Sequence, residues 1–323
     1  MKIFLTGGSG FVGRHLIPVL KEAGHEVFAL ARSATSAQRV QQLGAVPVSD
    51  DLTHLSAHTS SALQQCEAVV HAAAHMDFTY DKAPFYAINV EATQRLLSLS
   101  QQAGIAHFIY ISAAPVVPGS PIVNLRESEA EPGLPKALYP KTKALAEKAI
   151  LAANRPGFRT LSLRPPAIWG PENHHYEELF ENARKGRWRW IGGNHQILST
   201  IHVRNLAQAV LAGLNSALGG EAFFVTDGDR RSMRTTFSGI MQAYGIEAGE
   251  KEIPRGLVVF LAHFLGGIWK ALGLKSRPPL APIMVRLMAT EFSVNDEKAR
   301  QQLGYQPVLS FEDGIHQLAT TGN

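Results

Sequence analysis

The chain contains little cysteine, little charge and no apolar run of membrane-spanning length. Cys66 is the single cysteine among 323 residues, which excludes an internal disulfide and a cysteine metal cluster and fits a reducing, cytoplasmic location. The longest apolar run, 257–269, has about 13 residues, whereas a transmembrane helix needs roughly 20. We therefore predict no transmembrane span and expect a buried helix there; a helix that lies against lipid is the alternative.

Charge is also scattered rather than blocked. Charged residues make up 18% of the chain, hydrophobic residues 45%, and the net charge is +4, which is typical of a folded globular protein. The densest basic and aromatic stretch, 184–190, is interpreted as a solvated helix end because no wider basic face accompanies it. We expect no nucleic-acid partner. The apolar run 3–5 is too short for a signal peptide.

Glycines follow this first apolar run. Residues 7–13 read GGSGFVG and lie between a predicted strand and a predicted helix, which is the order that binding of a dinucleotide pyrophosphate requires. Glycine permits positive φ and a close approach of backbone to phosphate. A helix N-terminus adds free N–H groups. The spacing fits both Gly8-x-Gly10-x-x-Gly13 and Gly7-x-x-Gly10-x-x-Gly13.

Strand and helix patterns then alternate. Short, wholly apolar strands between helices are typical of a parallel sheet covered on both faces, so we predict a doubly wound α/β domain, a Rossmann fold. We assign it residues 1–165 with interleaved segments near 199–226, and a smaller, helix-rich substrate lobe to residues 166–198 and 227–323. The expected strands are 3–6, 26–31, 46–49, 68–71, 107–112 and 160–164; the expected helices are 14–23, 37–44, 60–66, 89–103 and 138–154.

A tyrosine and a lysine open the last of these helices. Tyr139 and Lys143 are four residues apart and therefore share one helix face. Reduction of a carbonyl by hydride needs a proton donor, and the reverse reaction needs a base. A nearby ammonium lowers the pKa of a phenol from its usual value of roughly 10. We predict that Tyr139 is the acid/base and that Lys143 lowers its pKa.

Together, these features resemble the extended (atypical) short-chain dehydrogenase/reductases, the NAD(P)-dependent epimerase/dehydratase superfamily. Within it, the chain is similar to the group of 3β-hydroxysteroid dehydrogenases, dihydroflavonol reductases and 2-alkyl-3-oxoalkanoate reductases. The matching segments extend over nearly the whole chain: 6–13, 51–52, 71–74, 89–90, 139–143, 164–171, 201–207 and 298–307.

The resemblance implies a role for each matching position. Tyr139 is implied to be the catalytic acid/base and Lys143 its partner at the nicotinamide ribose. A homodimer through helices 89–103 and 138–154 is also implied. The remaining residues implied to bind the cofactor are Gly7, Gly10, Phe11, Val12, Gly13, Asp51, Leu52, Ala72, Ala73, Ala74, Pro166 and Ile168.

One position departs from the family. A Ser or Thr hydroxyl before the Tyr helix binds the substrate oxygen in the family, and alignment on Val116 places Ala113 there. Ser112 matches the preceding, usually structural position. Either Ser112 reaches the substrate or the hydroxyl is missing, and loss of such a donor costs on the order of 10²–10³ in rate. Ser112 is therefore kept as a candidate catalytic residue.

Arg32 directly follows the second expected strand, 26–31. An NAD site places a carboxylate there to bind the ribose 2′-hydroxyl, and none is present. Arg32, with Arg14 just after the glycines, is available for a 2′-phosphate. We predict NADP(H) in preference to NAD(H), and no metal site.

Three functions are compatible with these residues. The sequence favours an NAD(P)-dependent oxidoreductase that transfers a hydride to or from a carbonyl or secondary alcohol of an apolar small molecule. A nucleotide-sugar epimerase or dehydratase would use Arg184, Arg187 and Arg204 as diphosphate clamps. A non-catalytic NADP-binding sensor or assembly protein would account for Ala113.

Overall fold

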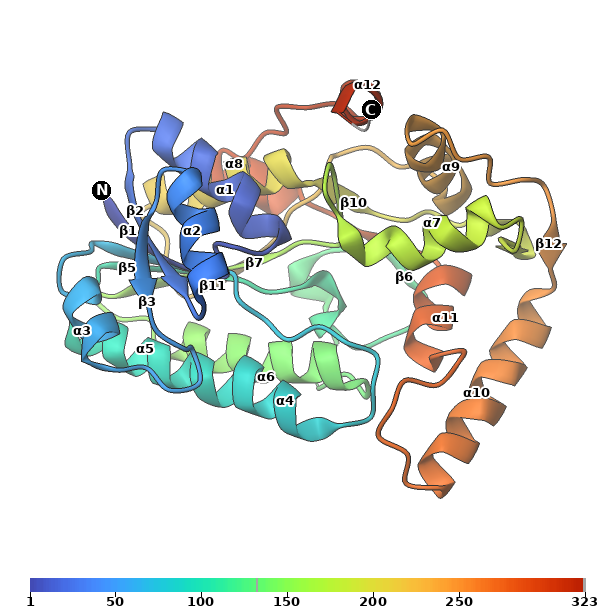
Figure 1. Ribbon diagram of the computed structural model, residues 1–323, viewed down its shortest axis with the longest axis horizontal. Coiled ribbons are helices and arrows are strands. Elements are labelled where there is room, and N and C mark those ends of the chain that lie inside the picture. Colours follow the sequence, from blue (N-terminus) through green and yellow to red (C-terminus); the bar gives the residue numbers. More distant parts are fainter. Residues whose placement is uncertain (132, 322–323) are drawn as a thin grey trace.

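A computed structural model describes residues 1–131 and 133–321. Its main sheet has seven parallel strands in the order β11-β7-β5-β4-β1-β2-β3 (Figure 1). The order reverses between β1 and β4, and ligands of such sheets bind beside the carboxyl ends at this reversal. The strands are β1 (Lys2–Thr6), β2 (Glu26–Ala31), β3 (Val46–Ser49), β4 (Ala68–His71), β5 (His107–Ile111), β7 (Arg159–Arg164) and β11 (Glu221–Phe224).

Helices cover both faces of this sheet (Figure 1). Because side chains alternate along a strand, Ile3 packs with Leu16 on one face and Phe4 packs with Ile150 on the other. One face carries α1 (Phe11–Glu22), α2 (Ala34–Gln42) and α8 (Val203–Asn215); the other carries α3 (Ala57–Leu63), α5 (Thr93–Gln102) and α6 (Leu138–Ala152), with α4 (Lys82–Tyr86) beside α6. The predicted Rossmann fold is confirmed. The predicted helix 89–103 begins in a π-helical segment, Ala87–Ala92.

Beyond β7 the chain leaves the sheet and returns to it through β11. Between them, β8 (Ala167–Trp169) and β10 (Thr200–His202) pair with each other outside the main sheet. Two further short pairs join β9 (Trp190–Ile191) to β12 (Glu252–Ile253) and β6 (Ile122–Leu125) to β13 (Phe292–Val294). The later helices are α7 (Glu177–Arg184), α9 (Met233–Ala243), α10 (Arg255–Ala271), α11 (Pro282–Ala289) and α12 (Phe311–Thr321). The division into two domains stays a prediction.

One expectation for this second part was correct only in part, and another was wrong. Residues 184–187 are an exposed helix end, as predicted, but Trp188 and Trp190 are buried in a second core beside Trp169. The helix at 257–269 forms, but it is not buried, because only its inner side packs against α11 and β9. No helix in the described ranges is long and apolar enough to cross a bilayer.

Candidate active site

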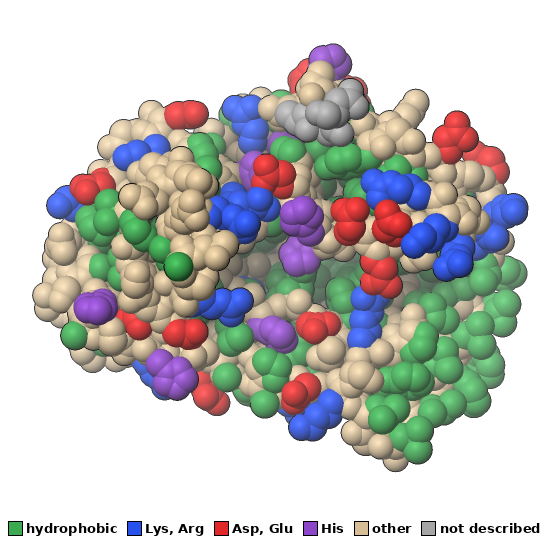
Figure 2. All heavy atoms as spheres, viewed as in Figure 1, with side chains coloured by type: hydrophobic (Ala, Val, Ile, Leu, Met, Phe, Trp, Pro, Cys, Tyr) green, Lys and Arg blue, Asp and Glu red, His purple; other side chains and the backbone are tan. Residues whose placement is uncertain are grey.

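A cleft of about 2070 Å³ lies over the carboxyl ends of the central strands and extends to α10 and α11. Figure 2 shows the hollow between the two halves of the molecule. All the predicted site residues line this cleft except Gly13: Gly7, Gly10, Phe11, Val12, Arg32, Asp51, Leu52, Ala72, Ala73, Ala74, Ser112, Tyr139, Lys143, Pro166 and Ile168. The fold therefore brings together segments that lie far apart in the sequence.

The glycine turn packs directly against the loop that follows β4. Gly7 has φ +74°, and a Cβ atom there would lie 2.8 Å from the Ala73 nitrogen. At Gly10 a Cβ atom would meet only the Gly7 carbonyl oxygen, at 3.3 Å, so space is open on the cleft side. Gly13 does not line the cleft, but it is needed for packing. A Cβ atom added at this position would lie 2.2 Å from the Gly7 carbonyl oxygen. Glycine at this position lets α1 begin against the turn.

This turn fits a dinucleotide pyrophosphate. Gly10 precedes α1 and no side chain caps the helix, so the N–H groups of the first turn are available to phosphate oxygens. Buried hydrogen bonds fix the neighbouring strand ends: the Thr6 hydroxyl contacts His71 Nδ1 at 2.6 Å and accepts from the Ala73 N–H at 3.2 Å. Burial lowers the pKa of His71 to about 3, so its ring is neutral near pH 7. The ring hydrogen-bonds to the hydroxyls of Thr6 and Thr93.

Arg32 and Asp51 lie at the ends of the adjacent strands β2 and β3. The Asp51 carboxylate accepts from the Thr53 hydroxyl and N–H, which lowers its pKa, and Arg32 adds a smaller effect. Within the described residues, the exposed Arg32 side chain forms no hydrogen bond or ion pair. Arg14, expected to add charge beside the cofactor, instead pairs with Glu172 and does not line the cleft.

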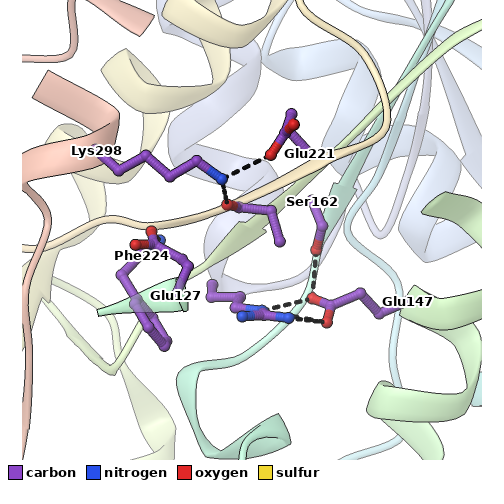
Figure 3. Close-up of polar contacts among 8 residues, drawn as sticks. Glu127, Glu147, Ser162, Glu221, Phe224 and Lys298 are labelled. Atoms are coloured by element: carbon purple, nitrogen blue, oxygen red, sulfur yellow. Dashed lines mark hydrogen bonds and ion pairs between the residues drawn. The ribbon is translucent and has the colours of Figure 1, made fainter. Parts of the chain in front are cut away.

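Helix α6 carries both Tyr139 and Lys143 and is anchored to β7 by a buried ion pair. Glu147 accepts from Arg164 Nη2 at 2.6 Å and from the Ser162 hydroxyl at 2.6 Å (Figure 3). Glu147 is four residues beyond Lys143, so the anchor lies one turn below the functional pair. Removing one partner of a buried ion pair commonly destabilises a protein by about 3–5 kcal/mol.

The expected electrostatic relation between Tyr139 and Lys143 is not observed. Burial raises the pKa of Tyr139 to about 12, whereas a lowered pKa was predicted. The Lys143 ammonium donates to the Ile111 carbonyl at 2.6 Å and lies 4.0 Å from the centre of the Tyr110 ring. Burial lowers the pKa of Lys143 to about 7, with Glu147 acting in the opposite direction. The full positive charge needed to stabilise a phenolate is therefore reduced.

Two residues that line this cleft have a buried polar side-chain atom without a partner within the described residues. Ser112 Oγ is one of them, and its residue is only 3% exposed. The Ser112 and Ala114 N–H groups donate to the Leu163 and Pro165 carbonyls, both at 2.8 Å, which fixes the loop after β5 against the continuation of β7. Ala113, at the family's functional position, also lines the cleft but offers no hydroxyl.

The second such atom is His75 Nε2, which the sequence analysis did not single out. Its backbone is fixed by Asn89, which accepts from the His75 N–H at 2.7 Å and donates to the His75 carbonyl at 3.0 Å. Asn89 also donates to the Thr142 hydroxyl at 3.1 Å, and Thr142 donates to the Tyr139 carbonyl at 3.0 Å. The loop after β4 is thus tied to the helix that carries Tyr139. The matching segment 89–90 was the available signal for Asn89; His75 had none.

The candidate clamps of a nucleotide-sugar enzyme lie elsewhere. Arg184, Arg187 and Arg204 are exposed and do not line the cleft. The described residues contain no group of three or more His, Cys, Asp or Glu side chains suited to a metal ion.

The fold, together with the family and the relatives that the chain matches, identifies an NAD(P)-dependent oxidoreductase of the short-chain dehydrogenase/reductase superfamily. More narrowly, residues 4–255 match the 3-beta hydroxysteroid dehydrogenase/isomerase family, and the chain belongs to this family.

Among similar proteins, a 4-hydroxy-2-methyl-3-oxo-4-farnesyl-3,4-dihydroquinoline-1-oxide ketoreductase of Stigmatella aurantiaca is 35% identical, covering 100% of this chain and 97% of the relative. A decarboxylating sterol-4-alpha-carboxylate 3-dehydrogenase of Dictyostelium discoideum is 30% identical over 98% of this chain and 99% of the relative. The solved UDP-glucuronic acid 4-epimerase of Bacillus cereus has the same fold, with a TM-score of 0.75 at 21% identity over 99% of this chain and 98% of that one.

Proposed function

We propose that the protein is an NADP(H)-dependent reductase of a ketone carried by an apolar small molecule. The observation that carries the proposal is that Tyr139, Lys143 and Ser112 line one cleft with the glycine turn and with apolar side chains of α11 such as Val285 and Met288. Apolar pockets with few polar groups suit such ligands. Relatives named for a farnesyl dihydroquinoline oxide, sterol carboxylates and alkyl oxoalkanoates support an apolar substrate.

In the proposed reaction, the protein's own residues handle the proton. A nicotinamide cofactor, when bound, supplies the hydride. The Tyr139 phenol is protonated near neutral pH because burial raises its pKa to about 12, and this form can give its proton to the carbonyl oxygen as the alcohol forms. The Ser112 hydroxyl donates a hydrogen bond to the same oxygen. Lys143, which lines the same cleft, would hold the nicotinamide ribose.

Replacing Tyr139 by Phe tests the role of the phenol. Loss of general acid catalysis typically lowers the rate by about 10²–10⁴-fold. We expect a loss of this size in kcat of ketone reduction, with NADPH affinity within twofold of wild type because the ring is kept. Unchanged turnover in Tyr139→Phe would contradict the proposal. NADPH binding without turnover of any ketone or alcohol by the wild type would instead favour a sensor or assembly protein.

The preference for NADP(H) is proposed from Arg32. Its side chain lines the cleft and has no acidic partner within hydrogen-bonding distance among the described residues. We expect Arg32→Gln to weaken NADPH binding by roughly 10- to 100-fold, the loss of a charged hydrogen bond, and to leave NADH binding unchanged. Isothermal titration with both cofactors measures this. Arg39→Gln, an exposed arginine of α2 outside the cleft, is the matched control. Tighter binding of NADH than NADPH by the wild type would contradict the proposal.

The cytoplasmic location and the homodimer through the region of α5 and α6 stay predictions. Light scattering of the purified protein tests the dimer.

A further inference from the structure

The Lys143 ammonium is buried without a carboxylate partner. The residue is only 1% exposed, and its Nζ atom forms no ion pair within the described residues. It donates to the Ile111 carbonyl at 2.6 Å and lies 4.0 Å from the centre of the Tyr110 ring. A buried ammonium loses its charge unless other groups replace the water around it. One carbonyl oxygen serves only one of its three donors, so the aromatic ring is the second support of this charge.

Tyr110 offers the ammonium its ring rather than its hydroxyl. The residue is 0% exposed, and its hydroxyl has no hydrogen-bond partner within the described residues. The face of an aromatic ring carries negative charge density and attracts a cation within about 6 Å, most strongly where both groups are out of water. Burial raises the pKa of Tyr110 well above its usual value, so the phenol itself stays neutral. Tyr110 does not line the cleft and can therefore act on a bound ligand only through Lys143.

The other titratable groups around Lys143 are either paired or neutral. Glu147, one turn further along α6, raises the pKa of Lys143, but its carboxylate is shared with Arg164 of β7. His71 of β4 is neutral near pH 7, because burial lowers its pKa to about 3. Tyr139 is protonated, because burial raises its pKa to about 12. The ring is therefore the neighbour that stabilises the ammonium without being titrated or shared with another cation.

We propose that Tyr110 is a positioning residue for Lys143: the face of its ring holds the ammonium at the cleft wall and keeps it charged. The support is rigid, because β5 is an inner strand that pairs with both β4 and β7. The use of this charge to hold a nicotinamide ribose rests on the proposed function, whereas the support of the ammonium by the ring does not.

Titration of Lys143 in the cofactor-free chain tests the role of the ring. The full chain is labelled with carbon-13 at lysine Cε, and the NMR signal of Lys143 is identified by its loss in Lys143→Met. We expect Tyr110→Leu to lower the pH midpoint of this signal by at least about one unit, because a desolvated cation–π contact is lost. Tyr110→Phe keeps the ring and should leave the midpoint within about 0.3 units of the wild type.

Two further variants separate the ring from its contribution to packing. Phe108→Leu is the matched control, because Phe108 is also 0% exposed and belongs to the same core, but its ring does not lie over the ammonium. It should destabilise the protein and leave the midpoint unchanged. Tyr110→4-cyanophenylalanine, introduced at an amber codon, keeps a ring of similar size while the cyano group withdraws electron density from its face. It should lower the midpoint in the same direction as Tyr110→Leu, even if the leucine variant does not fold.

Binding of NADP⁺ provides a second readout, measured by isothermal titration at two pH values. With a lower midpoint, Tyr110→Leu should bind NADP⁺ up to about tenfold more weakly than the wild type at pH 8, where less of its Lys143 is charged. At pH 5.5 the lysine is largely charged in both proteins, so the difference should fall below about twofold. A purely structural role for Tyr110 would weaken binding equally at both pH values.

The proposal is overturned if Tyr110→Leu and Tyr110→4-cyanophenylalanine both keep the wild-type midpoint, or if Phe108→Leu lowers it as far as Tyr110→Leu does. Turnover of a ketone distinguishes this failure from that of the proposed function. A Tyr139→Phe enzyme with unchanged turnover would contradict the proposed function and leave the midpoints of Lys143 as evidence for the ring. Unchanged midpoints beside an inactive Tyr139→Phe enzyme would contradict only the role of Tyr110.

Discussion

Helices α8 and α10 are both rich in apolar residues, yet one is buried and the other is largely exposed. In α8, the buried positions lie on several sides, and they include Leu206, Val210 and Leu214. α8 is enclosed because it packs against both α1 and the sheet strands β5 and β7. In α10 the buried residues are Val258, Ala262 and Gly266, which form a single stripe.

The difference shows that apolar content does not determine burial. The neighbours available to a helix decide how many of its sides are covered. α8 packs on the main sheet, whereas α10 lies at the edge of the molecule beside α11 (Figure 1). Apolar side chains on the remaining sides of α10 therefore stay in contact with solvent unless a partner covers them.

The largest difference between the two parts of the molecule is expected from substituting one glycine in each part. Gly13→Ala in α1 should lower NADPH affinity by at least tenfold or prevent folding, because the new Cβ atom would lie 2.2 Å from the Gly7 oxygen. Gly267→Ala in α10 meets nothing within 4 Å and should stabilise the protein by up to about 1 kcal/mol. Calorimetry and thermal unfolding measure both. A Gly13→Ala protein with wild-type affinity and stability would show that the turn tolerates a side chain.

Truncating one leucine in each helix compares how much α8 and α10 contribute to the free energy of unfolding. Leu206→Ala removes a side chain of α8 that is 0% exposed and should cost about 2–5 kcal/mol of unfolding free energy. Leu257→Ala removes a side chain of α10 that is 49% exposed and should change this free energy by no more than about 0.5 kcal/mol. Urea unfolding of the two variants gives the difference. Equal losses would mean that Leu257 is covered in solution.

Two serines compare the cleft with the segment that follows α10. Ser112→Ala should lower kcat of ketone reduction on the order of 10²-fold, because an oxyanion donor would be lost. Ser276→Ala, after α10 and outside the cleft, should leave kcat within twofold of wild type. Steady-state kinetics of both variants is the measurement. A Ser112→Ala enzyme with wild-type kcat would mean that the substrate oxygen has no hydroxyl partner besides Tyr139.

The smallest expected effect is a pH slope from Lys143. Its folded pKa of about 7 lies below the usual value of 10.5, so the unfolded chain binds more protons between these values. Stability should therefore rise with pH above 7 from this group, by at most about 1.4 kcal/mol per pH unit. Urea unfolding without added cofactor at pH 7.0 and 8.5 should show a smaller rise in Lys143→Met. The same rise in both proteins would mean that Lys143 is not desolvated.

Sequence reasoning was most reliable where the fold depends on local pattern. The glycine turn and the apolar strands determine the parallel sheet, and a shared sheet edge brings Tyr139, Asp51 and Ala73 to one cleft. It failed where distant segments decide the outcome. Burial of Trp188 and Trp190, exposure of α10 and the pairing of Arg14 with Glu172 all depend on neighbours far along the chain.

The electrostatics of the site were also beyond local reasoning. The spacing of Tyr139 and Lys143 places them on one helix face, but their pKa values depend on burial by the surrounding walls. The Lys143 ammonium is directed to Ile111 by the strand beneath it. His75 was missed because its unpartnered nitrogen becomes apparent only when the loop after β4 is seen in place, fixed by Asn89.

The Glu147–Arg164 pair has a consequence for motion. It fastens α6 to β7, and Asn89 fastens the same helix to the loop after β4, so the wall that carries Tyr139 is expected to move with the sheet as one body. The opposite wall is joined to this one by the exposed Lys275–Asp81 pair, which contributes little in water, and by the Tyr80 N–H, which donates to the Lys275 carbonyl at 2.9 Å. Opening and closing of the cleft, and with it the release of product, should therefore occur on the α10 side while the reacting groups stay in register.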